Sequence, residues 1–205
     1  MQSSTYASEL VRSIERRLAN RHFAVLRVAK IKFDEIATLC RIRDISRSGA
    51  RIETNMPVAV DSVATLEIRS DLKAIGTVVW TSGNQLGLRF HRPVNIEVFL
   101  GRGSSSMGNI RARRPRFRSV ARAVIEGLEG DSYAVLRDIS LEGASFELIE
   151  SRRLLRIGEQ MAIRIEGLPR KRASVKWVGV ESFGIQFGNP IQFPELEHWL
   201  LRSGS

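Results

Sequence analysis

The sequence predicts an all-β protein built from two tandem antiparallel barrels, each with six strands, and with short flanking helices. Three observations predict this class. The two halves of the chain repeat one sequence pattern at a spacing of about one hundred residues. Each half holds six short segments that are β-branched or alternate in polarity, separated by polar or glycine-bearing breaks. No helical pattern lies between these segments, which is typical of an antiparallel barrel.

The repeat consists of an Arg-x-x-x-Arg pair, an Asp-Ile-Ser-x-x-Gly turn, and a tryptophan-bearing strand that leads to Gly-x-x-Phe. Arg114 lies 97 residues after Arg17, whereas Asp138 lies 94 residues after Asp44. A difference of three residues belongs in loops, where extra length costs little closure entropy. The period is too long for a solenoid unit and matches a domain. The sequence therefore predicts a duplicated domain.

Residues 1–20 are predicted to form an N-terminal helix, because Leu10, Ile14 and Leu18 share one face at helical spacing within Ser8–Ala19. The first domain is assigned to residues 17–99. Its six strands are predicted at Phe23–Phe33, Ile36–Ile45, Ala50–Thr54, Ser62–Ile68, Ala74–Trp80 and Leu86–Phe90.

Residues 100–112 contain Gly-Arg-Gly-Ser-Ser-Ser-Met-Gly without apolar periodicity, which predicts a flexible linker. The second domain is assigned to residues 113–205. Its strands are predicted at Val120–Leu128, Tyr133–Ile139, Ala144–Leu148, Gln160–Ile165, Ala173–Val178 and Gly184–Phe187. A short amphipathic helix with a proline start is predicted to follow at Phe193–Leu201.

Composition excludes several classes of protein. The 205 residues are 43% hydrophobic, so each half has enough apolar residues for a core of its own. No apolar run approaches the ~20 residues of a membrane span, and the N-terminus lacks the layout of a secretion signal. Cys40 is the single cysteine, and the histidines are scattered. We therefore expect a cytoplasmic protein that is not an enzyme and holds no metal or other cofactor.

A formal net charge of +10 predicts an anionic ligand, and the arginines indicate which kind. Six arginines lie between Arg111 and Arg122, and no acidic residue lies between Leu100 and Ile125. Guanidinium groups without a local carboxylate suit bidentate contact with phosphate oxygens and with the O6/N7 edge of guanine. Pro115 keeps this segment out of a helix, so its arginines are expected on extended or turning backbone.

The Asp-x-Ser-x-x-Gly turn adds the complementary groups. Gly143 is expected to supply a positive φ, while Asp138 and Ser140 offer a carboxylate and a hydroxyl. In isolation, such side chains commonly bond to the backbone of their own turn. Because the turn follows an arginine pair in both halves, a ligand site is favoured: the carboxylate for guanine N–H donors, the hydroxyl and guanidinium groups for phosphate.

These motifs in this order resemble the bacterial PilZ domain, a family of small six-stranded barrels that bind cyclic di-GMP. The resemblance covers nearly the whole chain and implies that the arginines contact guanine and phosphate while the turn contacts the other face of the ligand. It also implies that an arginine just before the pair goes with two stacked ligands. The site residues implied are Arg16, Arg17, Arg21, Asp44, Ser46 and Gly49 in the first copy, and Arg113, Arg114, Arg118, Asp138, Ser140 and Gly143 in the second.

The predicted function is a cyclic di-GMP receptor that changes conformation or partner binding, with an unidentified downstream protein, in motility or biofilm signalling. One alternative is a basic RNA- or DNA-binding barrel, which exposed aromatic residues among the arginines would favour. Only Phe117 meets that condition, because Trp80 and Trp177 are expected in the cores. The other alternative is a PilZ protein-interaction module without ligand, against which the intact motifs in both halves count.

The two sites are not expected to be equal. Arg17 falls at the end of the predicted N-terminal helix, which would fix its direction, whereas Arg114 follows a segment with nothing to fold it alone. The second domain is therefore expected to hold the stronger site, and its arginine segment is expected to become ordered when the ligand binds.

Overall fold

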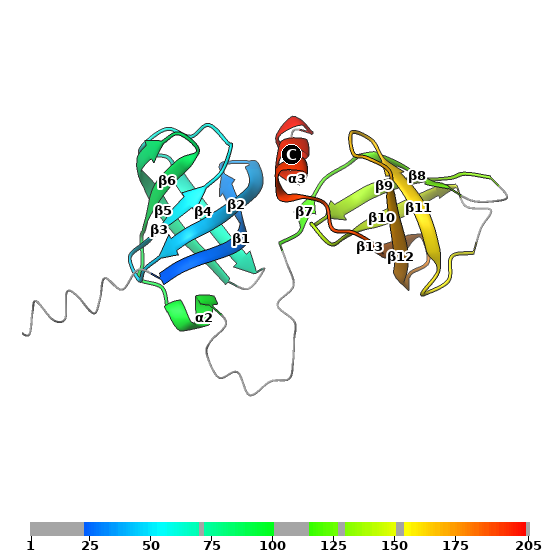
Figure 1. Cartoon of the computed structure of the whole chain (residues 1–205), viewed down its shortest axis with the longest axis horizontal. Helices are drawn as coiled ribbons and strands as arrows, with labels where there is room; N and C mark the ends of the chain where they lie inside the picture. Colours follow the sequence, from blue (N-terminus) through cyan, green and yellow to red (C-terminus); the bar gives the residue numbers. More distant parts are fainter. Residues whose placement is uncertain (1–22, 70–71, 101–114, 127–129, 151–153, 204–205) are drawn as a thin grey trace, which may run out of the picture. The chain divides into compact units, whose positions relative to one another are not determined.

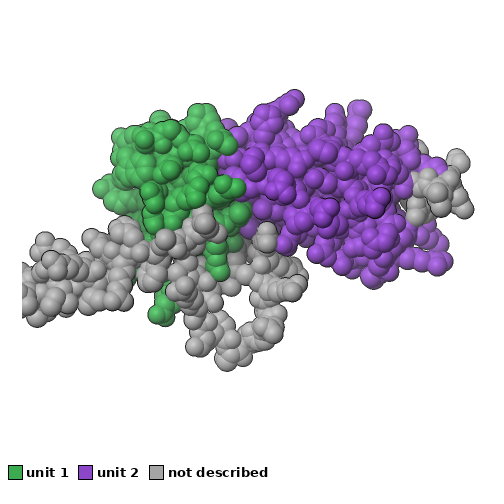
Figure 2. All heavy atoms as spheres, viewed as in Figure 1, with its two compact units in different colours: residues 1–34, 40–113 green, residues 35–39, 114–205 purple. Residues whose placement is uncertain are grey.

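A computed structural model of the chain describes residues 23–69, 72–100, 115–126, 130–150 and 154–203 (Figure 1). The predicted helix Ser8–Ala19, the linker after Leu100, and Arg16, Arg17, Arg21, Arg113 and Arg114 lie outside these ranges. The chain divides into two compact units, residues 1–34 with 40–113 and residues 35–39 with 114–205 (Figure 2). The strand that contains residues 36–39 pairs within the first barrel, with which it is described below.

The first unit contains a closed antiparallel barrel with the strand order β1-β2-β3-β6-β5-β4. All six predicted strands are confirmed, with small shifts at their ends. Their bounds are β1 Phe23–Phe33, β2 Ile36–Ile45, β3 Gly49–Glu53, β4 Val63–Arg69, β5 Leu72–Ser82 and β6 Gln85–Phe90. The helix α2, Ile96–Leu100, follows and was not predicted, because five residues are too few to show helical periodicity. The Asn95 side-chain oxygen accepts hydrogen bonds from the backbone N–H groups of its first turn.

Alternation of side chains along these strands builds the core of the first barrel. Inward-facing aliphatic residues such as Ile31, Ile52 and Leu66 are fully buried. Closure of the sheet leaves no exposed strand edge, so the barrel needs no partner to satisfy its backbone hydrogen bonds. Cys40 is buried in this core, where it packs as a small apolar residue.

The second unit repeats the barrel, with β8-β9-β10-β13-β12-β11 in the places of the first six strands. An additional two-residue strand, β7, pairs with β9. The bounds are β7 Phe117–Arg118, β8 Arg122–Glu126, β9 Ser132–Ile139, β10 Gly143–Glu150, β11 Gln160–Ile165, β12 Lys171–Val178 and β13 Ser182–Phe187. The predicted strand at Val120–Leu128 therefore begins later, at Arg122, and the backbone before it is broken into β7.

The helix α3, Phe193–Arg202, closes the second unit and confirms the predicted C-terminal helix. Gln192 and Glu195 form a reciprocal capping box at its start. Leu196 and Leu200 are buried, and the Trp199 indole N–H donates a hydrogen bond of 2.8 Å to the Glu166 carbonyl. The helix is thus tied to the second barrel by an apolar face and a polar contact.

Trp80 and Trp177 do not lie in the cores, contrary to the expectation. Their side chains are 40% and 43% exposed. In β5 the register shifts between Val78 and Trp80, and in β12 it shifts before Trp177, so each strand carries one extra residue there. Such a β-bulge reverses the alternation and turns the tryptophan outward. No helix in the described part of the chain is long and apolar enough to cross a membrane.

Candidate functional site

A second β-bulge in each barrel turns the aspartate of the motif outward. Arg137 is the extra residue of β9 just before Asp138, and Arg43 is the extra residue of β2 just before Asp44. Strict alternation would have directed these carboxylates into the apolar interior, where an unpaired charge is very costly. The bulges instead place them on the outer face, on the same side as the exposed tryptophans.

The strand register then brings the two motifs of the second barrel into one row. Arg118 in β7 lies directly opposite Asp138 in β9, and Asp138 lies opposite Ser145 in β10. Ser145 lies opposite Gly184 in β13, and Gly184 lies opposite Trp177 in β12. Side chains opposite one another in adjacent strands are neighbours, about 4.5–5.5 Å apart at Cβ. The second arginine of the pair therefore lies beside the aspartate of the turn.

Asp138 is the centre of this row. Its Oδ1 pairs with the guanidinium group of Arg116, and its Oδ2 accepts a hydrogen bond from the Ser145 hydroxyl. The carboxylate is about a quarter exposed. The sequence shows no acidic residue near these arginines, and the expectation that they are unpaired is wrong for Arg116. Its partner lies 22 residues along the chain and is brought close only by the β7–β9 pairing.

The serine of each turn is used within the turn itself. Ser140 donates to the Gly143 carbonyl at 3.0 Å and accepts from the Gly143 N–H at 3.2 Å, and Ser46 donates to the Gly49 carbonyl at 3.2 Å. Both serine residues are buried. This geometry favours the turn-stabilising interpretation of the two serines, while a direct contact with a ligand stays a prediction.

Gly49 and Gly143 are required for a reason other than the one predicted. Neither has a positive φ. A Cβ at Gly143 would overlap the Ile185 carbonyl oxygen, and a Cβ at Gly49 would lie 2.5 Å from that of Leu88. The glycines therefore allow the start of one strand to approach the backbone of the next closely.

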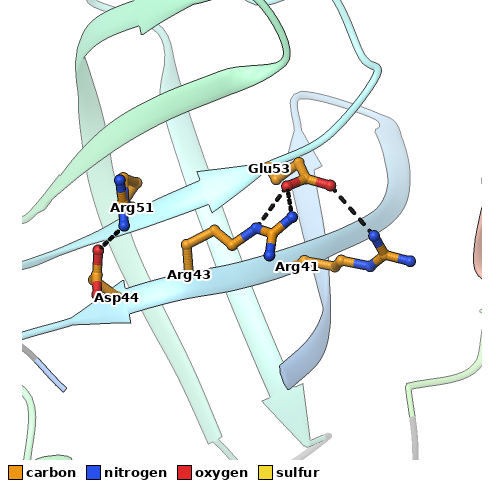
Figure 3. A network of polar contacts seen from close by, with 5 residues as sticks. All are labelled: Arg41, Arg43, Asp44, Arg51 and Glu53. Atoms are coloured by element: carbon orange, nitrogen blue, oxygen red, sulfur yellow. Dashed lines mark hydrogen bonds and ion pairs between the residues drawn. The ribbon is translucent and has the colours of Figure 1, made fainter. Parts of the chain in front are cut away.

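The first barrel repeats the row with one important change. Asp44 lies opposite Arg51, Arg51 opposite Gly87, and Gly87 opposite Trp80. Arg51 thus occupies the place of Ser145 and forms an ion pair with Asp44 at 2.5 Å (Figure 3). The groups around this row line a cavity of about 590 Å³. Its lining includes Asp44, Ser46, Ser48, Arg51, Trp80 and Arg89.

An ion pair beside the aspartate is common to both barrels. In the first, Arg43 Nε donates to Glu53 at 2.6 Å, and Arg41 also lies 3.4 Å from that carboxylate (Figure 3). In the second, Arg137 pairs with Glu147, and these two residues occupy the positions of Arg43 and Glu53. The bulged arginine therefore has a cross-strand partner in each domain.

The sequence matches the model of the PilZ domain twice, over residues 15–98 and 110–202. The chain belongs to the PilZ domain family. A search of curated protein sequences finds no match.

Several solved structures are similar. The Bacillus subtilis inhibitor of motility MotI/DgrA has a TM-score of 0.38 and 14% identity, over 88% of this chain and 97% of that one. Borreliella burgdorferi PlzA in complex with c-di-GMP has a TM-score of 0.33 and 14% identity, over 94% and 98% of the two chains. Escherichia coli YcgR in complex with c-di-GMP has a TM-score of 0.32 and 13% identity, over 94% and 86%.

In the two PilZ domains, the described motif residues are placed consistently. Asp44 and Asp138 are on the outer face, each turn is closed by its serine, and Arg118 is beside its aspartate. The remaining motif arginines lie outside the described residues and stay predictions: Arg16, Arg17, Arg21, Arg113 and Arg114.

Sequence reasoning missed four members of the two rows, namely Arg51, Ser145, Trp80 and Trp177. Arg51 and Ser145 each follow the motif glycine by two residues, and alternation places such a residue on the face of that glycine. The positions of Arg51 and Ser145 on this face could therefore have been predicted from the sequence. The outward direction of the tryptophans could not, because it depends on a β-bulge. Among the described residues, no group of His, Cys, Asp and Glu could hold a metal ion.

Proposed function

We propose that the protein is a receptor for cyclic di-GMP, which it binds on the outer face of the second PilZ domain without altering it chemically. The observation that best supports this is the row in which Arg118, Asp138 and Ser145 lie opposite one another on three adjacent strands. Membership of the PilZ family supports the same ligand, since both copies of its arginine and turn motifs are present in the sequence.

Asp138 can still accept hydrogen bonds from the edge of a guanine base. Each carboxylate oxygen has two lone pairs, and the described contacts use one on Oδ1 for Arg116 and one on Oδ2 for Ser145. The remaining lone pairs can accept the N1–H and N2–H groups of guanine together. The existing contacts then orient the carboxylate before the ligand arrives, which reduces the ordering cost of binding.

The arginines near Asp138 suit the phosphodiester groups of the ligand and the O6/N7 edge of its guanines. Arg118 is exposed beside Asp138, and Arg113 and Arg114 precede it by a few residues. Guanidinium groups bind phosphodiester oxygens and the O6/N7 edge of guanine in a planar, bidentate manner. At the other end of the row, Trp177 offers a half-exposed indole on which a base can stack. An arginine at position 113 goes with a stacked pair of ligands in this family.

The first PilZ domain offers a related but different site. We assign Asp44, Ser46 and Gly49 to it, together with Arg16, Arg17 and Arg21. Each aspartate pairs with an arginine, but Oδ2 of Asp44 is contacted by the long side chain of Arg51, where Oδ2 of Asp138 is contacted by the small Ser145 hydroxyl. Arg51 therefore leaves less room for a guanine beside Asp44. We expect this site to bind cyclic di-GMP more weakly than the second.

Ligand binding would change the interaction of this protein with a partner protein. The arginine segment of the second domain directly follows the connection between the domains, so ordering of that segment would change how the two PilZ domains are held. We propose that an unidentified cytoplasmic partner detects this change, in signalling that controls motility or biofilm formation.

Calorimetric titration of the full chain tests the proposal. We expect cyclic di-GMP to bind far more tightly than GMP or GTP, because two guanines and two phosphodiesters satisfy more of these groups at once. Equal affinity for the three nucleotides, or no binding of any, would reject the receptor function.

A further inference from the structure

Arg116 lies between the two arginines of the motif in the second domain, and its described contact is with the aspartate of the turn. Its guanidinium group pairs with Oδ1 of Asp138, and the Ser145 hydroxyl donates to Oδ2 of the same carboxylate. The two contacts come from β7 and β10, which pair with β9 on its two sides. Both oxygens of Asp138 are therefore held, and together these contacts set the plane of the carboxylate.

The alternation of side chains along β7 directs Arg116 to the face of the site. Pro115 and Phe117 are buried, whereas Arg116 and Arg118 are exposed. Arg116 and Arg118 therefore share one face of the segment. The β-bulge in β9 turns Asp138 to this same face, so that a contact between Arg116 and the carboxylate becomes possible.

Phe117 anchors this segment in the second barrel. Its side chain is 1% exposed, and its backbone pairs with Ile139 of β9. Phe117 is therefore not the exposed aromatic residue that would favour RNA or DNA binding. Because its burial does not depend on the ion pair, we expect β7 to stay in place when Arg116 loses its partner.

The sequence of the first domain lacks both of these residues. The spacing of 97 residues between the two copies of the arginine pair relates Arg116 to Ala19 and Phe117 to Asn20. An alanine side chain cannot pair with a carboxylate, and an asparagine has no large apolar side chain to bury. Arg116 therefore distinguishes the second domain from the first.

Folding stability does not account for the ion pair. The side chains of Arg116 and Asp138 are 47% and 27% exposed. Exposed ion pairs of this kind contribute little to stability, because water weakens the attraction and two side chains lose rotamer freedom. The main consequence of the contact is the direction in which Asp138 points.

From these contacts we propose that Arg116 is a positioning residue that makes the second domain selective for guanine, and that it acts through Asp138. This inference rests on the cyclic di-GMP site proposed above. Guanine presents two adjacent donors on one edge, N1–H and N2–H, whereas hypoxanthine lacks the N2 amino group. A carboxylate held in one plane can accept both donors together. A carboxylate that rotates freely must first be ordered, which reduces the advantage of the second donor.

Calorimetric titration of the full chain with cyclic di-GMP and with cyclic di-IMP tests the inference. Cyclic di-IMP keeps both phosphodiesters and N1–H but lacks the N2 amino groups. The test variant is Arg116→Ala, which introduces the residue that the first domain has at this position. Arg122→Ala is the matched control, because it removes an exposed arginine from β8 of the same domain.

We expect the natural protein to bind cyclic di-GMP at least about tenfold more tightly than cyclic di-IMP, since a hydrogen bond to a charged group is worth that much. In Arg116→Ala this ratio should fall to about threefold or less, because the carboxylate is no longer held. Arg122→Ala should keep the natural ratio. An equal loss of affinity for both ligands in Arg116→Ala, with the ratio unchanged, would overturn the proposal.

A double-mutant cycle tests whether Arg116 acts through Asp138. Arg116→Ala should weaken cyclic di-GMP binding about fivefold or more in the natural background, but less than about twofold in an Asp138→Ala background. Equal losses in the two backgrounds would indicate that Arg116 contacts the ligand directly and would reject the positioning role. Circular dichroism and thermal melting should show Arg116→Ala to be about as stable as the natural protein. A large loss of stability would assign the ion pair a structural role instead.

Failure of this inference can be told apart from failure of the receptor function. If the natural protein binds cyclic di-GMP and Arg116→Ala leaves the ratio unchanged, only the role of Arg116 is rejected. If the natural protein binds neither ligand, the receptor function and the role of Arg116 are rejected together. Tighter binding of cyclic di-GMP by Arg116→Ala would identify Arg116 as a competitor of the ligand for Asp138, which also contradicts the positioning role.

Discussion

The indole of Trp177 lies directly against Gly184 of the neighbouring strand, where any Cβ would overlap its ring nitrogen. Trp80 and Gly87 repeat this contact in the first barrel. The glycine of the Gly-x-x-Phe motif is therefore the surface on which the outward tryptophan lies. This contact holds the aromatic end of each row at a fixed distance from the aspartate end.

We expect Gly184→Ala to destabilise the second domain by about 1–3 kcal/mol, because the added methyl group displaces the indole from a close contact. Denaturant unfolding followed by tryptophan fluorescence measures this. Gly188→Ala is the matched control, since a Cβ there meets its nearest atom, the Arg172 carbonyl oxygen, at an ordinary 3.4 Å. The tight-contact interpretation is wrong if Gly184→Ala is as stable as the control.

Asp138→Ala should weaken cyclic di-GMP binding by about tenfold or more, because hydrogen bonds to a charged group are worth ~1.5–3 kcal/mol each. The change removes the acceptor that we propose for guanine, and it also releases Arg116 and Ser145. Asp131→Ala is a suitable control, as it removes an exposed carboxylate that pairs with Arg164 in the same domain. Calorimetry on both variants decides the matter. Similar affinities for the two would remove Asp138 from the site.

The two PilZ domains should respond differently to loss of an arginine. Arg118→Ala should remove most of the cyclic di-GMP binding, because Arg118 lies directly opposite Asp138. Arg21→Ala should reduce it less, since the first domain has the long Arg51 side chain beside its aspartate where the second has Ser145. Calorimetric affinities of the two variants measure the difference. Loss of binding in Arg21→Ala with binding intact in Arg118→Ala would reverse this ranking of the sites.

Hydrogen exchange should show the backbone of residues 111–116 gaining protection when cyclic di-GMP is added. Ordering costs ~1–2 kcal/mol per residue, which several charge-assisted bonds formed together can offset. Phe117 and Arg118 already pair with β9, so the gain is expected to end before them. The sequence predicts ordering of the whole arginine segment, and the β7–β9 pairing narrows the expected region to residues 111–116. Strong protection of residues 111–116 without ligand would contradict binding-coupled ordering.

Much of this protein could be predicted from local sequence. The duplication predicted two domains, and alternating apolar residues predicted twelve barrel strands, because a strand that buries one face must alternate. The order of the motifs indicated the family and predicted the position of both turns. Predictions failed where alternation is interrupted: the bulges after Ile42, Val78, Leu136 and Val175 turn aspartates and tryptophans outward.

The contacts of the site depended on tertiary structure. Arg116 and Asp138 are far apart in sequence, and only the pairing of β7 with β9 makes them partners. Gly143 reads as a turn glycine in sequence, but its requirement comes from the backbone of β13. Arg51 is visible in the sequence as the residue two positions after Gly49. Its place in one row with Asp44 and Trp80 became visible only when the strand register was known, because register decides which side chains share a surface.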